Sequence, residues 1–143
     1  YEVSNHARPG GESRHNLTYW LGGDYVGIGP GAHGRLNGRA LRQHRAPDAW
    51  LEMVERQGHG TREDDALDPA TRAEELVMMG LRLVDGIDAA TFAAIAGRPL
   101  WDVLDPNGLA RMEDGGFVER SAAGLRVTPA GMLVLNAVTA ELI

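Results

Sequence analysis

Four side chains that could contact a ligand fall within six residues near the start of the chain: His15, Asn16, Tyr19 and Trp20. An imidazole can ligate a metal or haem iron, or transfer protons. Indole and phenol rings offer flat apolar walls with polar tips, which suit a planar aromatic ligand. We therefore expect a ligand-facing polar loop here. Spacing alone leaves a structural alternative open, in which His15 is a solvated loop residue and Trp20 anchors the loop.

A glycine-rich segment follows closely, with the sequence Gly27-Ile28-Gly29-Pro30-Gly31-Ala32-His33-Gly34. Glycines allow the backbone to approach a ligand closely. The spacing does not match a dinucleotide-binding fingerprint, because the third glycine comes one residue early and Pro30 removes a donor amide. Two interpretations stay open: close approach to another kind of ligand, or a tight loop whose glycines only serve positive φ.

Composition excludes several classes of function. The chain has 143 residues, a net charge of −6, no cysteine, and arginine as its only fixed cation. An acidic chain has little attraction for nucleic acid or anionic membranes, and without cysteine it has neither disulfides nor thiolate metal sites. The sequence contains no run of about 18 apolar residues, which a membrane-spanning helix would need. Because the chain begins at Tyr1 within an expected strand, we expect it to be part of a longer protein.

The elements expected in the first part are short strands and one helix. Strands are predicted at 1–3, 25–28 and 41–44, each bounded by Gly, Pro or Asn. Pro47 and Asp48 predict the start of a helix that ends at Gly58. The polar segment 58–67 shows no periodicity, and we expect a linker there.

The remainder is predicted to be mainly helical. Asp68 and Pro69 start a helix that should end at Gly86, with Val84 facing inward. Asp88 caps a second helix, which should bury Ile95 and stop at Gly97. A third helical region follows Pro99 and restarts at 105–106. A β-hairpin joins 117–119 to 125–127, and a last helix starts at 128–129. This order predicts a winged-helix-like domain. Acidic residues around its third helix argue against DNA binding.

Several motifs together resemble one known family. They are Tyr1-Glu2-Val3-Ser4-Asn5, Ala7-Arg8-Pro9-Gly10, Arg14-His15-Asn16-Leu17-Thr18-Tyr19-Trp20, the glycine-rich segment, and Leu125-Arg126-Val127-Thr128-Pro129-x-Gly131. The chain is similar to the second half of the oxygen-independent coproporphyrinogen III oxidase-like radical S-adenosylmethionine proteins. Its His-Asn-x-x-Tyr-Trp signature resembles that of the haem chaperone (HemW-like) branch, a signature that true coproporphyrinogen oxidases lack.

The resemblance implies an α/β part followed by an α+β part. Residues 1–57 would be the C-terminal part of a partial (β/α) radical S-adenosylmethionine barrel, 58–67 a linker, and 68–143 a HemN-type, winged-helix-like C-terminal domain. The intact protein would bind a [4Fe-4S] cluster, S-adenosylmethionine and haem. This chain has no cysteine and cannot hold the cluster. Haem is therefore the one ligand that we expect this chain to bind by itself, and we expect no catalytic residue in this chain.

Carried over residue by residue, the resemblance places His15, Asn16, Tyr19 and Trp20 at a haem site, with His15 as the iron ligand. Gly29, Gly31 and Ala32 would line the barrel near S-adenosylmethionine.

The leading hypothesis is a cytoplasmic haem chaperone that passes haem to an acceptor protein. Two alternatives stay open. One is an enzyme of porphyrin biosynthesis, oxygen-independent coproporphyrinogen III oxidase, which decarboxylates its substrate oxidatively to protoporphyrinogen IX. The other is a winged-helix interaction module. A homodimer formed through unpaired sheet edges is a further expectation.

Overall fold

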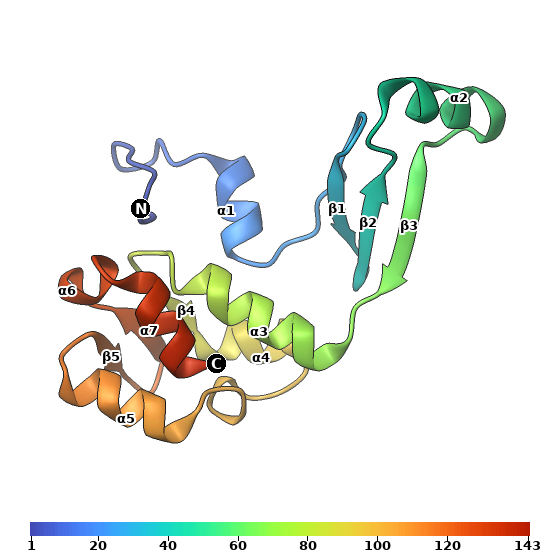
Figure 1. Cartoon of the computed structure of the whole chain (residues 1–143). Coiled ribbons are helices and arrows are strands. Elements are labelled where there is room, and N and C mark those ends of the chain that lie inside the picture. Colours follow the sequence, from blue (N-terminus) through green and yellow to red (C-terminus); the bar gives the residue numbers. More distant parts are fainter. The chain divides into compact units, whose positions relative to one another are not determined.

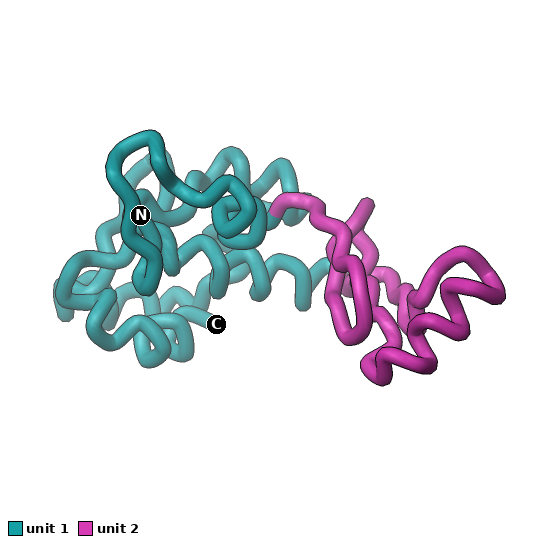
Figure 2. The backbone as a smooth tube through the Cα atoms, turned by 90° about the horizontal axis from the view of Figure 1, so that it is seen from above, with its two compact units in different colours: residues 1–22, 69–143 teal, residues 23–68 magenta.

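The computed structural model describes all 143 residues and divides them into two compact units. Unit 1 combines residues 1–22 with 69–143, and unit 2 is the segment 23–68 between them (Figure 2). This division differs from the expected ranges 1–57, 58–67 and 68–143, because the first 22 residues pack with the helical part of the chain. The assignment of those ranges to domains of a longer protein stays a prediction.

Unit 1 is built mainly from short helices around a small sheet (Figure 1). Its helices are α1 (Arg14–Trp20), α3 (Pro69–Gly80), α4 (Ala89–Ala96), the 3-10 turn η1 (Leu100–Asp102), α5 (Pro106–Asp114), α6 (Pro129–Met132) and α7 (Leu135–Leu142). The caps follow the predicted chemistry: Asp88 accepts a hydrogen bond from the Thr91 amide, and Gly97 ends α4 in the left-handed region. Asp105 caps α5, in which Pro106 is the first residue.

The sheet of unit 1 is antiparallel and has three strands in the order β4 (Ile87–Asp88), β6 (Gly124–Val127) and β5 (Val118–Arg120). The predicted hairpin is confirmed, with Val118 opposite Val127 and Arg120 opposite Leu125. Strand β4 was not predicted, since two residues are too few to show an alternating pattern. It pairs with β6 and leads directly into α4.

The core of the protein lies entirely in unit 1. Its buried side chains come from α3, α4, η1, α5, α7, the sheet and the intervening loops: Ala73, Leu76, Val77, Leu81, Ile87, Phe92, Leu100, Leu104, Leu109, Val118, Leu125, Val127, Leu135, Val138 and Leu142. The predicted inward-facing stripe of α3 is confirmed at Ala73, Leu76, Val77 and Gly80.

Two predicted core positions are wrong. The helix α3 ends at Gly80 rather than at Gly86, because the chain turns there and Val84 points to solvent with 54% of its surface exposed. Ile95 is 41% exposed although Phe92 on the same helix is buried. The final helix is also interrupted, since α6 ends at Met132 and α7 begins at Leu135.

Unit 2 is a three-stranded antiparallel sheet with one helix. Strands β1 (His33–Leu36), β2 (Arg39–Gln43) and β3 (Thr61–Ala66) pair in sequence order, and α2 (Pro47–Gln57) connects the last two (Figure 1). The predicted helix start at Pro47 and stop at Gly58 are confirmed. The strand predicted at 41–44 is observed as β2. Of the strand predicted at 25–28, only Tyr25 pairs, through a bridge to Arg35.

Strand β3 replaces most of the linker that the sequence suggested at 58–67. Its Thr-Arg-Glu-Asp-Asp-Ala sequence has no apolar alternation, so hydrophobic patterning could not reveal it. Charge pairs across the sheet hold it instead: Arg39 Nε lies 2.5 Å from Asp64 Oδ1, and Arg42 Nη1 lies 3.3 Å from Glu63 Oε2. Opposite charges on neighbouring strands favour this pairing.

Unit 2 buries no apolar side chain fully. The hydrophobic core lies outside it, and Val26, Ile28, Leu36 and Leu51 are all exposed, Ile28 by 87%. A sheet of three strands needs a hydrophobic face, or packing against a helix, for independent stability. None of the helices in either unit has the length and the apolar content that a membrane span requires.

Candidate functional site

The segment predicted to be a ligand-facing loop is the helix α1. Ser13 caps it by accepting a hydrogen bond of 3.3 Å from the Asn16 amide. The expectation of a loop was therefore wrong, and the missed signal is Ser13, a favoured capping residue placed directly before the motif. In a helix, residues four apart share a face. The His-Asn-x-x-Tyr-Trp motif consequently falls into two pairs, His15 with Tyr19 and Asn16 with Trp20.

The Asn16–Trp20 pair faces the protein. The side-chain Nδ2 of Asn16 donates hydrogen bonds of 3.3 Å to the Tyr1 hydroxyl and to Asn5 Oδ1. The Trp20 ring lies under the guanidinium of Arg82, with 4.6 Å between the Arg82 Cζ and the ring centroid. Trp20 Nε1 and Arg82 Nε are buried without hydrogen-bond partners. The cation–π contact is therefore what attracts these two side chains to each other.

Arg82 also connects α1 to a buried carboxylate. Glu2 is 2% exposed, and its Oε1 lies 2.5 Å from Arg82 Nη2. The same carboxylate accepts hydrogen bonds from the Ser4 amide at 3.0 Å and from Asn5 Nδ2 at 2.5 Å. Glu2 and Arg82 together therefore link the first five residues and Trp20 to the turn after α3. This anchoring network consists of Glu2, Asn5, Asn16, Trp20 and Arg82.

The network sets the protonation of Glu2. Burial raises the pKa of this carboxyl, but hydrogen bonds from Asn5, Ser4 and Arg82 outweigh burial and hold the pKa below the ordinary 4.5. A carboxyl whose pKa is lower when folded stabilises the protein above its unfolded pKa. That contribution is lost as the pH falls through the folded pKa.

We therefore expect acidification below about pH 4.5 to weaken the attachment of residues 1–22. Urea unfolding measured from pH 7 downward should show the loss in the parent chain and a flatter profile in Glu2→Gln. The exposed Glu74→Gln is the matched control and should keep the parent profile. Equal pH profiles for Glu2→Gln and the parent chain would show that Glu2 does not carry the effect.

The His15–Tyr19 pair lies on a different face of α1 and reaches solvent. His15 is exposed, its Nε2 lies 3.0 Å from the Tyr19 hydroxyl oxygen, and the two rings meet edge to face at 4.8 Å and 89°. A solvent-accessible imidazole at a fixed position on an anchored helix can ligate a metal or haem iron or transfer a proton. The structure thus leaves His15 accessible, while Asn16 and Trp20 are engaged in holding α1.

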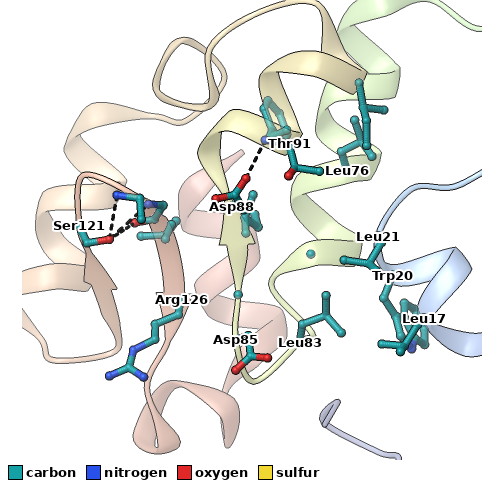
Figure 3. A pocket seen from close by; sticks show the side chains of 18 of the residues that line it. Leu17, Trp20, Leu21, Leu76, Leu83, Asp85, Asp88, Thr91, Ser121 and Arg126 are labelled. Carbon is teal, nitrogen blue, oxygen red and sulfur yellow. Dashed lines mark hydrogen bonds between the residues drawn. The ribbon is translucent and has the colours of Figure 1, made fainter. Parts of the chain in front are cut away.

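A pocket of about 820 Å³ lies beside α1 within unit 1. Leu17, Trp20 and Leu21 form the wall contributed by α1, and Leu76 and Leu83 lie near them (Figure 3). Phe92 also lines the pocket. Pockets of 300–1,000 Å³ with apolar and aromatic walls are typical of small-molecule sites. The exposed Leu21 and Ile95 both line it, which explains why Ile95 is not part of the core.

Of the four motif residues, the pocket brings in Trp20 alone. His15, Asn16 and Tyr19 are not part of its lining. Its far side carries charged groups, with Asp85, Asp88 and Arg126 arranged around β4 and β6 (Figure 3). The sequence did not reveal this pocket because its walls come from six separate helices and strands. The helical spacing of Leu17 and Leu21 would have been the available signal.

The glycine-rich segment forms a tight turn in unit 2. Gly29 and Gly31 have φ of 99° and 73°, which favour glycine. The Gly31 amide donates to the His44 carbonyl at 2.7 Å, and the Ala32 amide donates to the Gly29 carbonyl at 3.3 Å. These amides are therefore engaged within the unit, and the segment offers a ligand close backbone approach and the apolar side chain of Ile28.

No group of three or more metal-ligating side chains comes together anywhere in the chain, and it contains no cysteine. The residues present do not fit a [4Fe-4S] cluster, which needs thiolate ligands. A single axial imidazole on haem iron requires no such group, and His15 fits that requirement.

Comparison with known proteins gives three consistent findings. Residues 67–134 match the family of the HemN C-terminal domain. The chain is 37% identical over 153 residues to the mitochondrial radical S-adenosyl methionine domain-containing protein 1 of Bos taurus, an alignment covering 100% of this chain and 35% of that protein. It is 33% identical over 138 residues to the heme chaperone HemW of Bacillus subtilis, covering 96% and 36% respectively.

Among solved structures, coproporphyrinogen III oxidase (HemN) from Escherichia coli, a radical SAM enzyme, is similar with a TM-score of 0.64 and 19% identity. The match covers 83% of this chain and 28% of that one, and it shows that the two share a fold. The chain spans about a third of the length of the curated relatives given above.

Proposed function

This chain is a homologue of the HemW heme chaperones and of radical S-adenosyl methionine domain-containing protein 1, and from that relationship we propose that it is the haem-binding part of a haem chaperone. The observation that carries the proposal is the exposed imidazole of His15, presented on a helix whose other face is fixed to the protein. Haem is here the cargo, which the intact protein would bind and deliver to an acceptor protein.

The four motif residues take different roles in this proposal. His15 supplies the ligand to iron, and Tyr19 is the ring beside it. Asn16 and Trp20 keep α1 at a fixed orientation through the anchoring network, which limits the freedom that His15 loses on binding. Trp20 also presents its ring to the pocket, so an apolar ligand there would touch the same helix.

The two units suggest how this chain fits into a longer protein. We assign residues 1–57 to the closing part of a radical S-adenosylmethionine barrel. The other parts of that barrel would cover the exposed apolar side chains of unit 2. The strands of unit 2 are antiparallel, so the parallel pairing of a barrel would have to come from residues outside this chain. The order α3, α4, α5, β5, β6 and α7 supports a winged-helix-like assignment for 68–143.

The cofactors of the proposed protein divide between this chain and the remainder. The cluster must be held elsewhere, because this chain offers no thiolate. Gly29, Gly31 and Ala32 are proposed to lie against S-adenosylmethionine, with Ile28 giving apolar contact, since the amides of Gly31 and Ala32 are already engaged. This loop would shape the site without donating to the cofactor through those two amides.

Replacing His15 tests the proposed function. We expect His15→Ala to raise the dissociation constant of hemin at least about tenfold, because the iron loses its axial ligand, and to leave the melting temperature unchanged, because His15 is exposed. Hemin titration followed by Soret absorbance measures the affinity, and circular dichroism measures the melting temperature.

Two further variants make the titration specific. His59→Ala removes another exposed imidazole, located outside α1, and should bind hemin as the parent chain does. Leu21→Glu places a charge in the pocket at a half-exposed position, and it should also leave His15-dependent binding intact. Loss of binding in Leu21→Glu combined with normal binding in His15→Ala would move the haem site to the pocket and refute His15 as the ligand.

A further inference from the structure

We propose that the Tyr19 hydroxyl and haem iron compete for one atom, Nε2 of His15, so that Tyr19 weakens haem binding and promotes its release. The inference rests on the proposed function and adds a positioning residue to it. Its basis is the contact of 3.0 Å between the Tyr19 hydroxyl oxygen and His15 Nε2 on the exposed face of α1.

The geometry of the pair fixes which nitrogen is engaged. The two rings lie four residues apart on one helical turn and meet edge to face at 4.8 Å. The phenol O–H donates to Nε2 in the tautomer of His15 that carries its proton on Nδ1, and Nε2–H donates to the phenol oxygen in the other tautomer. In either tautomer, an Nε2 atom engaged with the Tyr19 hydroxyl cannot bind iron at the same time.

The other ring nitrogen is poorly placed for haem. Nδ1 is bonded to the ring carbon that joins the side chain to Cβ, so it lies close to the backbone of α1. A porphyrin is a broad, flat ring, and coordination through Nδ1 would bring it against the helix. Nε2 is the outermost atom of the side chain and avoids this obstruction. Iron therefore has to displace the Tyr19 hydroxyl.

This exchange suits a protein that must both take up and give up its cargo. When iron binds Nε2, the Tyr19 hydroxyl loses its bond to that nitrogen; when iron leaves, the bond to Nε2 re-forms. Because the pair is exposed, an intramolecular hydrogen bond of this kind is modest, with a net stabilisation that corresponds to roughly a two- to tenfold change in an equilibrium constant. The competition thus tunes the haem affinity without blocking binding.

The test is Tyr19→Phe, which keeps the ring beside His15 and removes only the hydroxyl. We expect the dissociation constant of hemin to fall roughly two- to tenfold and the transfer of haem to excess apomyoglobin to slow by a similar factor. Tyr25→Phe, which removes a hydroxyl outside α1 and in the other unit, is the control and should change neither value. An unchanged or weaker affinity in Tyr19→Phe would overturn the proposal.

A readout without haem separates this inference from the proposed function. Nitrogen-15 NMR of the His15 ring in the haem-free chain should show Nε2 as a hydrogen-bonded nitrogen, and Tyr19→Phe should shift that resonance while leaving His59 unaffected. If His15→Ala binds hemin normally, the proposed function fails whatever the NMR shows. If His15→Ala loses binding but Tyr19→Phe shifts neither the resonance nor the affinity, only the competition fails.

Discussion

Arg82→Ala is expected to lower the free energy of unfolding of unit 1 by about 3 kcal/mol. The substitution removes the cationic partner of Glu2, whose side chain is fully buried, and leaves a carboxylate that only Ser4 and Asn5 still contact. Breaking one side of a buried ion pair is costly because the remaining charge cannot be solvated. It also removes the guanidinium that covers the Trp20 ring.

The loss should be local before it is global, since Arg82 connects residues 1–22 to the helical part of unit 1 while the core lies elsewhere. Urea unfolding gives the overall change, and hydrogen exchange should show faster exchange of the α1 amides. Arg126→Ala is the matched control, because its ion pair with Glu119 is exposed on both sides and such pairs contribute at most about 1 kcal/mol. A similar loss in both variants would show that the network does not anchor α1.

Gly108→Ala is the second substitution with a large expected effect. Gly108 lies in the first turn of α5, and a Cβ there would overlap the backbone carbonyl oxygen of Glu141 in α7. Helix propensity alone predicts stabilisation by about 1 kcal/mol for this change. Overlap with backbone in a closely packed interface should reverse the sign, and we expect a net loss of at least about 2 kcal/mol.

The sign of the change is therefore the diagnostic quantity, measured by urea unfolding at neutral pH. Gly116→Ala provides the comparison, because a Cβ at that position meets nothing within 4 Å and only the left-handed backbone, with φ of 71°, opposes it. Its expected loss is about 1 kcal/mol. If Gly108→Ala stabilised the protein, α5 and α7 would not be in the close contact described.

The sequence predicted those elements whose signals are local. Capping by Asp88 and Asp105, the proline starts of α2 and α5, and the hairpin of β5 and β6 all follow from residues within a few positions of each other. The core positions of α3 also followed from helical spacing, except where the chain turns after Gly80. Such features depend on backbone chemistry that neighbouring residues decide.

The remaining features depend on contacts between distant residues, and the sequence did not reveal them. The helix α1 was expected to be a loop, because its polar and aromatic composition hid the Ser13 cap. The burial of Glu2 depends on Arg82, 80 positions away in the sequence. Strand β3 depends on arginines of β2. For the same reason the sequence did not reveal that Asn16 and Trp20 also hold the helix in place, through Tyr1, Asn5 and Arg82.

The most direct test of this account compares His15→Ala with Asn16→Ala in one hemin titration, each with its melting temperature. We expect His15→Ala to lose at least about tenfold in affinity at an unchanged melting temperature. Asn16→Ala should melt earlier, because it loses its bonds to Tyr1 and Asn5, and should bind hemin with nearly the parent affinity while folded. The reverse pattern, with hemin binding lost in Asn16→Ala and kept in His15→Ala, would contradict the division of the motif into an anchoring face and a binding face.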